Sequence, residues 1–308
     1  KIQLFFKLLF NIIKYNYFSV PKNTDIIFFN HPRRKKNDNG VFEDIYIDTI
    51  LNKSIVNSRS VVMEGFVNPN ILHFFPIKTS PIFYLDYIQF TGRIVGKFYS
   101  KKLDASDVNR IKYLEALILK NWGVSNINLV LLFQEYLARW KFTYRSIIYL
   151  YKKTKPKIIF NVVSYSFLNQ VSTFAAKDLQ IPVAELQHGT VGPFHIAYNF
   201  QNHSLLKLRT FPDYFLCWGK PWVFNSRLPI NNNNIIDIGF PFLEEFKDKY
   251  RNYEKKNQIL VLSQYRKDIF YMAEKLAEFM PDVNIIYKAH PAEYSSISIK
   301  SKFSNFSI

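Results

Sequence analysis

The sequence predicts an α/β fold made of two Rossmann-like domains with parallel sheets. Two stretches carry the same order of an apolar run, a segment with apolar residues at helical spacing, and a second apolar run. The first stretch comprises residues 157–163, 167–179 and 181–186. The second comprises residues 259–262, 269–280 and 284–287. Short connections of this kind give parallel strands joined by a right-handed crossover.

Other segments complete the expected elements. Further strands are predicted at residues 25–30, 60–66, 81–87, 213–219 and 235–239. Pro32 ends the first of these, because proline restricts the residue before it and has no backbone donor for a sheet. Residues 129–151 have apolar residues at helical spacing and predict a helix of several turns. The run of asparagines at 231–234 predicts a loop.

The length of 308 residues suits two domains. The charged stretch 244–257 is the expected boundary. The predicted organisation is a basic amphipathic segment at 1–20, an N-terminal acceptor-side α/β domain at 21–245, and a C-terminal nucleotide-binding α/β domain at 255–308. The last range is short for a complete α/β domain with a covered sheet. We therefore expect that domain to be truncated in this chain.

The formal net charge is +17, with 41 Lys and Arg against 24 Asp and Glu. This balance favours anionic partners or, equally well, a solvated basic surface. No nucleic-acid-binding signature accompanies it, so no nucleic acid is expected as a partner. The single cysteine, Cys217, excludes an intramolecular disulfide. No spacing of His, Cys or acidic residues is typical of a metal site, so we expect neither metal nor cofactor.

The first fourteen residues are apolar, with lysines at 1, 7 and 14. Lys7, Asn11 and Lys14 would share one face of a helix. This pattern fits a basic amphipathic helix lying on an anionic membrane surface. It also fits an ordinary first helix packed on the core. No run of eighteen apolar residues follows, so a spanning helix is not expected.

Two polar motifs follow predicted strands, where open parallel sheets bind ligands. After 181–186 come Gln187, His188, Gly189 and Thr190. Histidine can take a proton from a hydroxyl near neutral pH, and glycine lets a ligand approach the backbone. The motif therefore predicts a general base and its substrate contacts. The alternative is a histidine that only holds a loop.

The second motif, Lys288-Ala289-His290-Pro291, follows the strand at 284–287. If Pro291 opens a helix, free backbone amides and the helix dipole join Lys288 and His290 in a phosphate site. The alternative is a simple turn. Gln264 and Arg266 follow the neighbouring strand and could face the same crevice, where Arg266 could contact phosphate.

The remaining histidines have weaker cases. His195 and Tyr198 follow the first motif and could touch an acceptor, or belong only to a loop. For His31, His73 and His203 a structural role is favoured. The segment His31-Pro32-Arg33-Arg34 is the exception that most merits attention.

The order of these motifs resembles GT-B glycosyltransferases of bacterial surface polysaccharide synthesis. The nearest likeness is to capsule polysaccharide transferases and CDP-glycerol glycerophosphotransferases. It covers roughly residues 155–295 and rests on His188-Gly189-Thr190, Gly239-Phe240-Pro241, Gln264-Tyr265-Arg266 and the Lys288 motif. Pro241 is followed by Phe242, where the family carries arginine. The resemblance implies an acceptor domain, a nucleotide domain and a site in the cleft.

The resemblance further implies a transferase that moves a sugar or polyol phosphate from a nucleotide-activated donor, with a CMP or CDP type favoured. The acceptor would be a growing surface polysaccharide or a lipid-linked molecule. His188 would be the general base, and Lys288 and His290 would hold donor phosphate. The location would be cytoplasmic, on the inner face of the cell membrane. Two alternatives are a sugar-nucleotide epimerase of the same fold and an inactive binding or scaffold module.

Overall fold

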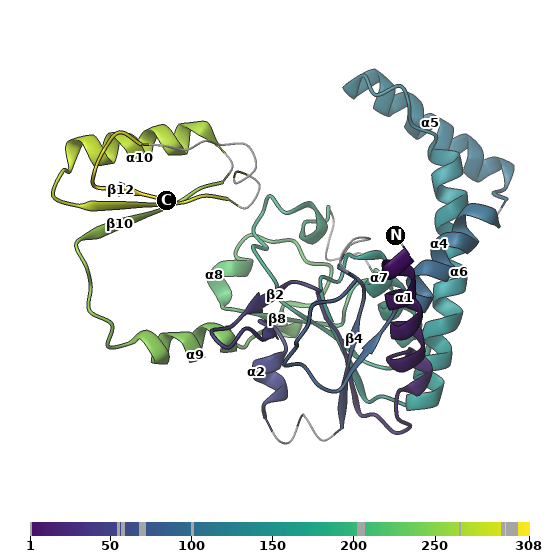
Figure 1. Cartoon of the computed structure of the whole chain (residues 1–308). Helices are drawn as coiled ribbons and strands as arrows, with labels where there is room; N and C mark the ends of the chain where they lie inside the picture. Colours follow the sequence, from purple (N-terminus) through teal and green to yellow (C-terminus); the bar gives the residue numbers. More distant parts are fainter. Residues whose placement is uncertain are drawn as a thin grey trace. The chain divides into compact units, whose positions relative to one another are not determined.

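The computed structural model describes residues 2–53, 56, 59–67, 72–99, 102–201, 207–264, 266–290, 293 and 301–308. The chain divides into two compact units, Lys1–Glu245 and Phe246–Ile308. Each unit has its own parallel sheet (Figure 1). The predicted α/β class, with two Rossmann-like units in succession that each have a parallel sheet, is confirmed. The assignment of the units to acceptor and nucleotide stays a prediction.

The sheet of the first unit has seven parallel strands in the order β5-β4-β1-β6-β7-β8-β9. Their bounds are β1 Ile26–Phe29, β4 Ser60–Glu64, β5 Ile82–Tyr84, β6 Ile158–Val162, β7 Val183–Leu186, β8 Tyr214–Cys217 and β9 Ile235–Asp237. The chain runs outwards from β1 to β5 and then returns to β6 on the other side of β1. Ligands of doubly wound sheets bind beside the carboxyl ends of the strands at such a reversal.

The same part of the chain contains the helices up to α9, the last of which crosses the boundary at Phe246 (Figure 1). They are α1 Ile2–Lys14, α2 Asp48–Leu51, α4 Asp86–Phe98, α5 Ala105–Trp122, α6 Leu129–Thr154, α7 Phe167–Asp178, α8 Lys220–Val223 and α9 Pro241–Tyr250, with 3-10 turns η1 Tyr17–Ser19, η2 Ile196–Tyr198 and η4 Asn232–Asn234. A short antiparallel hairpin, β2 Arg34–Lys36 with β3 Phe42–Asp44, follows β1. Helix α6 begins after Asn128, whose side chain accepts from the Leu131 amide, and Ser166 caps α7 in the same way.

Alternate side chains of the central strands enter two apolar clusters. Ile27 and Phe29 pack in one cluster with Ile147 of α6, whereas Phe28 packs in the other with Ile47, at the start of α2. Successive residues of a strand point to opposite faces, so both faces of this sheet are buried. This explains why the strands appear in the sequence as continuous apolar runs.

The elements with the clearest sequence patterns are confirmed with slightly different bounds. The expected strands at 157–163 and 181–186 are β6 and β7. They are connected by α7 in the sequence and pair with each other in parallel. The helix expected at 129–151 is α6. The charged stretch expected as a boundary is partly helical, because α9 extends to Tyr250. The asparagine run contains the short turn η4.

The sheet of the second unit has three parallel strands, β10 Gln258–Leu262, β11 Asn284–Lys288 and β12 Phe306–Ser307, in that order. Helix α10, Lys267–Phe279, connects β10 to β11 as predicted. Ala273 and Ala277 of α10 are buried with Ile285 and Tyr287 of β11. The small alanines let the helix lie close to the sheet.

The first helix is present, but its polar face is not the one that was expected. Asn11 is 1% exposed, whereas Phe10 is 55% and Ile13 is 76% exposed. Helix α1 packs against α4, and Asn11 is buried. The described helix therefore presents apolar residues outwards. In the part of the chain that the structure describes, no helix is long and apolar enough to cross a membrane.

Candidate active site

His188 lies two residues beyond β7, at the carboxyl edge of the large sheet. Its side chain is 13% exposed. Its Nε2 atom is 3.2 Å from the Tyr165 hydroxyl, and its Nδ1 atom is 3.4 Å from the Tyr198 hydroxyl. The Tyr46 hydroxyl donates to its backbone carbonyl at 2.9 Å. The ring is therefore held between phenols from two different loops.

Glu185, on β7 itself, completes this arrangement. It is fully buried, and its Oε1 atom accepts hydrogen bonds from the Ser164 amide at 3.0 Å and from the Tyr198 hydroxyl. The same Oε1 is 3.9 Å from Nδ1 of His188. Tyr198 thus bridges the carboxyl and the imidazole. If Nδ1 carries the proton, it donates to Tyr198, which donates to Glu185, and Nε2 is left as an acceptor.

Burial moves the pKa values of these two groups in opposite directions. Burial, together with the nearby charges of His31, His195 and Arg33, lowers the pKa of His188 to about 4. It raises the pKa of Glu185 to about 7, because a charged carboxylate is poorly solvated there. His188 is therefore neutral at pH 7 and can accept a proton. Pairs of groups with separated pKa values are typical of acid–base sites.

The reversal of strand order brings the segment after β1 to the same edge. The His31 and His188 rings are stacked, with 6.5 Å between their centroids and 12° between their planes. Burial and then the charge of Arg33 lower the pKa of His31. His31, in the segment that the sequence analysis singled out among the remaining histidines, thus lies beside the predicted base. A cationic and imidazole-rich surface suits an anionic substrate.

The rest of the first motif divides into internal and exposed residues. Gln187 is 1% exposed, and its amide donates to the Gly189 carbonyl and accepts from the Trp218 amide. Its side chain therefore holds the loop and joins the ends of β7 and β8. Thr190 is exposed. A side chain added at Gly189 would meet no atom within 4 Å, so the backbone there is open to a ligand.

The second motif lies in the second unit. Lys288 ends β11, and both Lys288 and His290 are exposed. Glu293 is 2% exposed and accepts from the His290 amide at 2.6 Å, from the Ser263 hydroxyl at 2.6 Å and from the Tyr287 hydroxyl at 3.2 Å. The carboxylate thus occupies the backbone amide of His290. Pro291 lies outside the described residues.

The residues after β10 show a local pairing. Arg266 donates to the Asp268 carboxylate at 2.6 and 3.1 Å, and both side chains are exposed. A phosphate would compete with Asp268 for this guanidinium. Gln264 is exposed at the same strand end. Its predicted contact with a ligand stays a prediction.

The remaining sequence predictions concern the Gly239-Phe240-Pro241 motif, His73 and His203. Phe240 stacks on Trp218 at 4.5 Å, and Pro241 begins α9, so this motif packs within the first unit. His73 is buried between Glu64 and Asp86, as a structural role requires. His203 lies outside the described residues. Among the residues that the structure describes, no three His, Cys, Asp or Glu side chains are grouped to hold a metal ion.

Sequence reasoning missed Glu185, Tyr165 and the bridging role of Tyr198. One signal was available for Glu185, since a carboxylate within the apolar run 181–186 must be buried and partnered. Nothing in the sequence marks Tyr165, because twenty tyrosines are spread along the chain. Its position depends on the pairing of β6 with β7.

No family model matches this sequence, and no curated protein matches it. Several solved structures are similar in fold. A UDP-GlcNAc 2-epimerase from Neisseria meningitidis, bound to UDP-GlcNAc, has 12% identity and a TM-score of 0.42, covering 87% of this chain and 66% of that one. A putative UDP-N-acetylglucosamine 2-epimerase from Listeria monocytogenes has 11% identity and a TM-score of 0.46, covering 94% and 68%. A glycotransferase of kitacinnamycin has 9% identity and a TM-score of 0.44, covering 93% and 70%.

The chain thus spans about two thirds of the length of these proteins.

Proposed function

We propose that this chain is a transferase that moves a sugar or polyol phosphate from a nucleotide-activated donor to an acceptor hydroxyl. The observation that carries the proposal is His188, a neutral and nearly buried imidazole at the carboxyl edge of the sheet. Its Nδ1 side is bridged through Tyr198 to Glu185. An acceptor hydroxyl would take the place of the Tyr165 hydroxyl at Nε2 and give up its proton as it attacks the donor.

On this proposal the donor phosphates bind the second unit. Lys288 and His290 are exposed cations or donors at one strand end, and Arg266 is exposed near the neighbouring strand end. Their charge would stabilise the leaving nucleotide as negative charge develops on it. A CMP or CDP type of donor is favoured by the family resemblance, and a surface polysaccharide or lipid-linked molecule is the proposed acceptor.

The first test is thermal stabilisation by CMP, CDP, UDP and GDP. One nucleotide is expected to raise the melting temperature of the wild type, because it binds the folded state, with a shift of about 2–4 °C per kcal/mol of binding energy. His290→Ala should reduce this shift, whereas Lys255→Ala, in the exposed charged stretch, should leave it unchanged. A shift that survives His290→Ala would contradict the assignment of the phosphate site.

A sugar-nucleotide epimerase is the second candidate. The opposed pKa values of His188 and Glu185 favour it, because an epimerase must remove a proton and return one. The two candidates differ in their need for an acceptor. An epimerase converts UDP-GlcNAc or a related donor alone, whereas a transferase releases nucleotide only when an acceptor is present.

We also propose that the enzyme docks on an anionic membrane surface near a lipid-linked acceptor. Helix α1 presents Phe10 and Ile13 to the outside, and Lys14 is exposed beside them. Helix α5 extends beyond the sheet (Figure 1), and Tyr113 and Trp122 on it are 68% and 72% exposed. Apolar and aromatic side chains next to lysines bind lipid interfaces.

This docking predicts co-sedimentation with vesicles that contain phosphatidylglycerol, but much less with phosphatidylcholine alone. Replacing both Phe10 and Ile13 by serine should reduce the bound fraction, because it removes apolar area from the interface. The matched control is Phe279→Ser, which removes a 77% exposed phenylalanine from α10. Equal binding of all three proteins would contradict docking through α1.

A further inference from the structure

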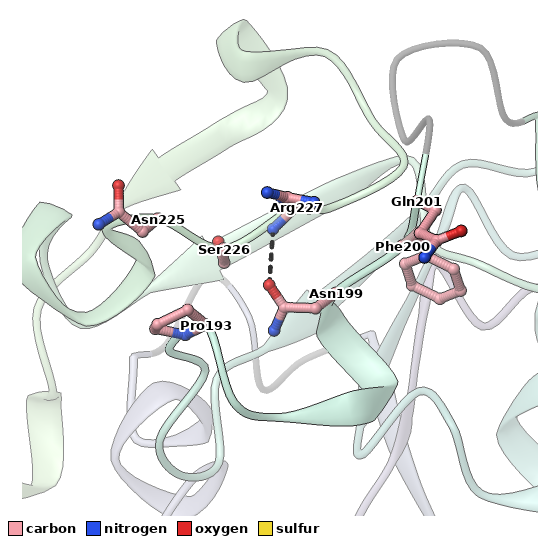
Figure 2. A pocket seen from close by; sticks show the side chains of 7 residues that line it. All are labelled: Pro193, Asn199, Phe200, Gln201, Asn225, Ser226 and Arg227. Atoms are coloured by element: carbon pink, nitrogen blue, oxygen red, sulfur yellow. Dashed lines mark hydrogen bonds between the residues drawn. The ribbon is translucent and has the colours of Figure 1, made fainter.

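A cavity lies in the first unit, lined in part by the loop that follows β7 and His188. It has a volume of about 640 Å³ and lies between two segments, residues 193–201 and 225–227. Figure 2 shows Pro193 and Asn225 on one side of Asn199 and Arg227, and Phe200 and Gln201 on the other. This volume is within the range of about 300–1,000 Å³ that is usual for small-molecule sites.

Asn199 fixes the walls of this cavity. Its amide donates to the carbonyls of Gly192 and His195, both at 2.9 Å. Its side-chain oxygen accepts from the Arg227 amide at 3.2 Å (Figure 2). The backbones of Asn199 and Arg227 also form a parallel bridge. The side-chain amide is therefore fully used in holding the two segments together, which makes the cavity a formed feature of the fold.

The same segment joins the cavity to the candidate active site. Tyr198, the residue before Asn199, reaches Glu185 and His188 with its hydroxyl. Pro193 is five residues beyond His188 in the same loop. A molecule held in the cavity therefore lies against the loop that positions the proposed base. An extended substrate could occupy both places.

The lining shows which ligand would fit. The guanidinium of Arg227 makes no hydrogen bond or ion pair with another residue of the described chain, and the same holds for the side-chain amides of Gln201 and Asn225. The wall contains no Asp or Glu among the described residues. Pro193 and Phe200 add apolar surface. A guanidinium matches a carboxylate or a phosphate, and free amides match hydroxyl groups.

We propose that this cavity binds an acidic sugar of the acceptor, one that carries a carboxylate or a phosphate, with Arg227 as its anion contact. This inference rests on the proposed transferase function, for which it supplies the class of acceptor. The sugar would be anchored at Arg227 while a neighbouring unit of the same acceptor presents its hydroxyl to His188.

The test is saturation-transfer NMR with glucuronic acid, glucose 6-phosphate and glucose. We expect the wild type to bind one or both acidic sugars and not glucose, and the two acidic probes separate a carboxylate ligand from a phosphate ligand. Arg227→Met should weaken binding about tenfold or more, because a hydrogen bond to a charged group is lost. Arg110→Met, which removes an equal charge from the exposed face of α5, should not weaken it.

Three outcomes would overturn the proposal. They are equal binding of glucose, an unchanged signal in Arg227→Met, and an equal loss in Arg110→Met. Arg227→Lys keeps the charge without the planar fork and should bind with intermediate strength, which separates recognition from misfolding. Nucleotide stabilisation is measured on the same proteins. If it persists while no acidic sugar binds, the cavity proposal fails and the donor site stands. If no nucleotide stabilises the wild type, the transferase function itself is contradicted.

Discussion

His188→Asn is expected to lower turnover of the nucleotide-activated donor by about 10²–10⁴-fold, the usual contribution of a general base. Asparagine has a similar size but no basic nitrogen. Its amide can still bond to Tyr198, so the loop should keep its shape. The measurement is nucleotide release with acceptor present, at saturating donor. Because Lys288 and His290 lie in the other unit, nucleotide stabilisation should be unchanged.

The matched control is His195→Asn, seven residues further along the same loop. The His195 ring lies 4.8 Å from the Tyr198 ring, but among the described contacts none joins it by hydrogen bond to His188. We expect its turnover to stay within about tenfold of the wild type, since no proton transfer is assigned to it. If both variants lose the same activity, the loss reflects the loop and the base is misassigned.

The same assay separates the candidate functions. A transferase shows the effect of His188→Asn only in the presence of acceptor. An epimerase shows it with donor alone, as a loss of the interconverted sugar nucleotide. An inactive scaffold shows no turnover in either protein, although nucleotide stabilisation persists. Tyr198→Phe adds a further check, because it removes the bridge to Glu185 while leaving the imidazole in place.

The sequence could predict the elements whose patterns are local. The unit β6–α7–β7 was predicted because each part is a short run with its own period and connecting residues. The position of His188 at the end of β7 follows directly. The same reasoning places His290 after β11.

The sequence could not predict which side chains surround His188. Tyr165, His31 and Tyr198 reach it from three separate loops, and their approach depends on β1 lying beside β6 and β6 beside β7. Strand order is a property of the whole sheet, whereas sequence periodicity reports only single strands. The hairpin β2–β3 was missed for a related reason, because its strands of three residues are too short to show a period.

The hairpin matters because it begins at Arg34, whose side chain enters the core, directly after Arg33, whose charge acts on His188. The side chain of Arg34 is completely buried, and its guanidinium contacts Oε2 of Glu64 at 2.5 Å. The other oxygen of Glu64 is 2.9 Å from Nδ1 of His73, whose Nε2 is 2.9 Å from Asp86. Glu64 lies on β4, so this chain of charges ties the hairpin to the sheet.

Glu64→Gln is therefore expected to destabilise the fold by about 3–5 kcal/mol, because it leaves Arg34 and His73 buried without their shared carboxylate. The measurement is the free energy of unfolding in urea. The control is Glu43→Gln on the same hairpin, where the pair with the 39% exposed Lys78 should be worth at most about 1 kcal/mol. Equal losses of unfolding free energy in both variants would show that the buried pair stabilises the fold no more than the exposed pair.

The dependence on pH follows from the directions of the two shifts. Burial alone would raise the pKa of Glu64, but His73 and Arg34 together lower it. The contribution of Glu64 to stability is therefore present above about pH 4.5 and is lost as the pH falls through the pKa of Glu64 in the folded protein. Burial alone would lower the pKa of His73, but Asp86 and Glu64 raise it. The contribution of His73 to stability is therefore present below about pH 6.5 and is lost as the pH rises through the pKa of His73 in the folded protein. The penalty of Glu64→Gln should therefore be largest between these limits. At pH 9 it should shrink without vanishing, because Arg34 remains charged and has lost its ion pair with Glu64, although it keeps its hydrogen bond to Thr79 and the attraction of Asp44 and Asp48. A penalty that does not change with pH would show that His73 is not protonated in the folded protein.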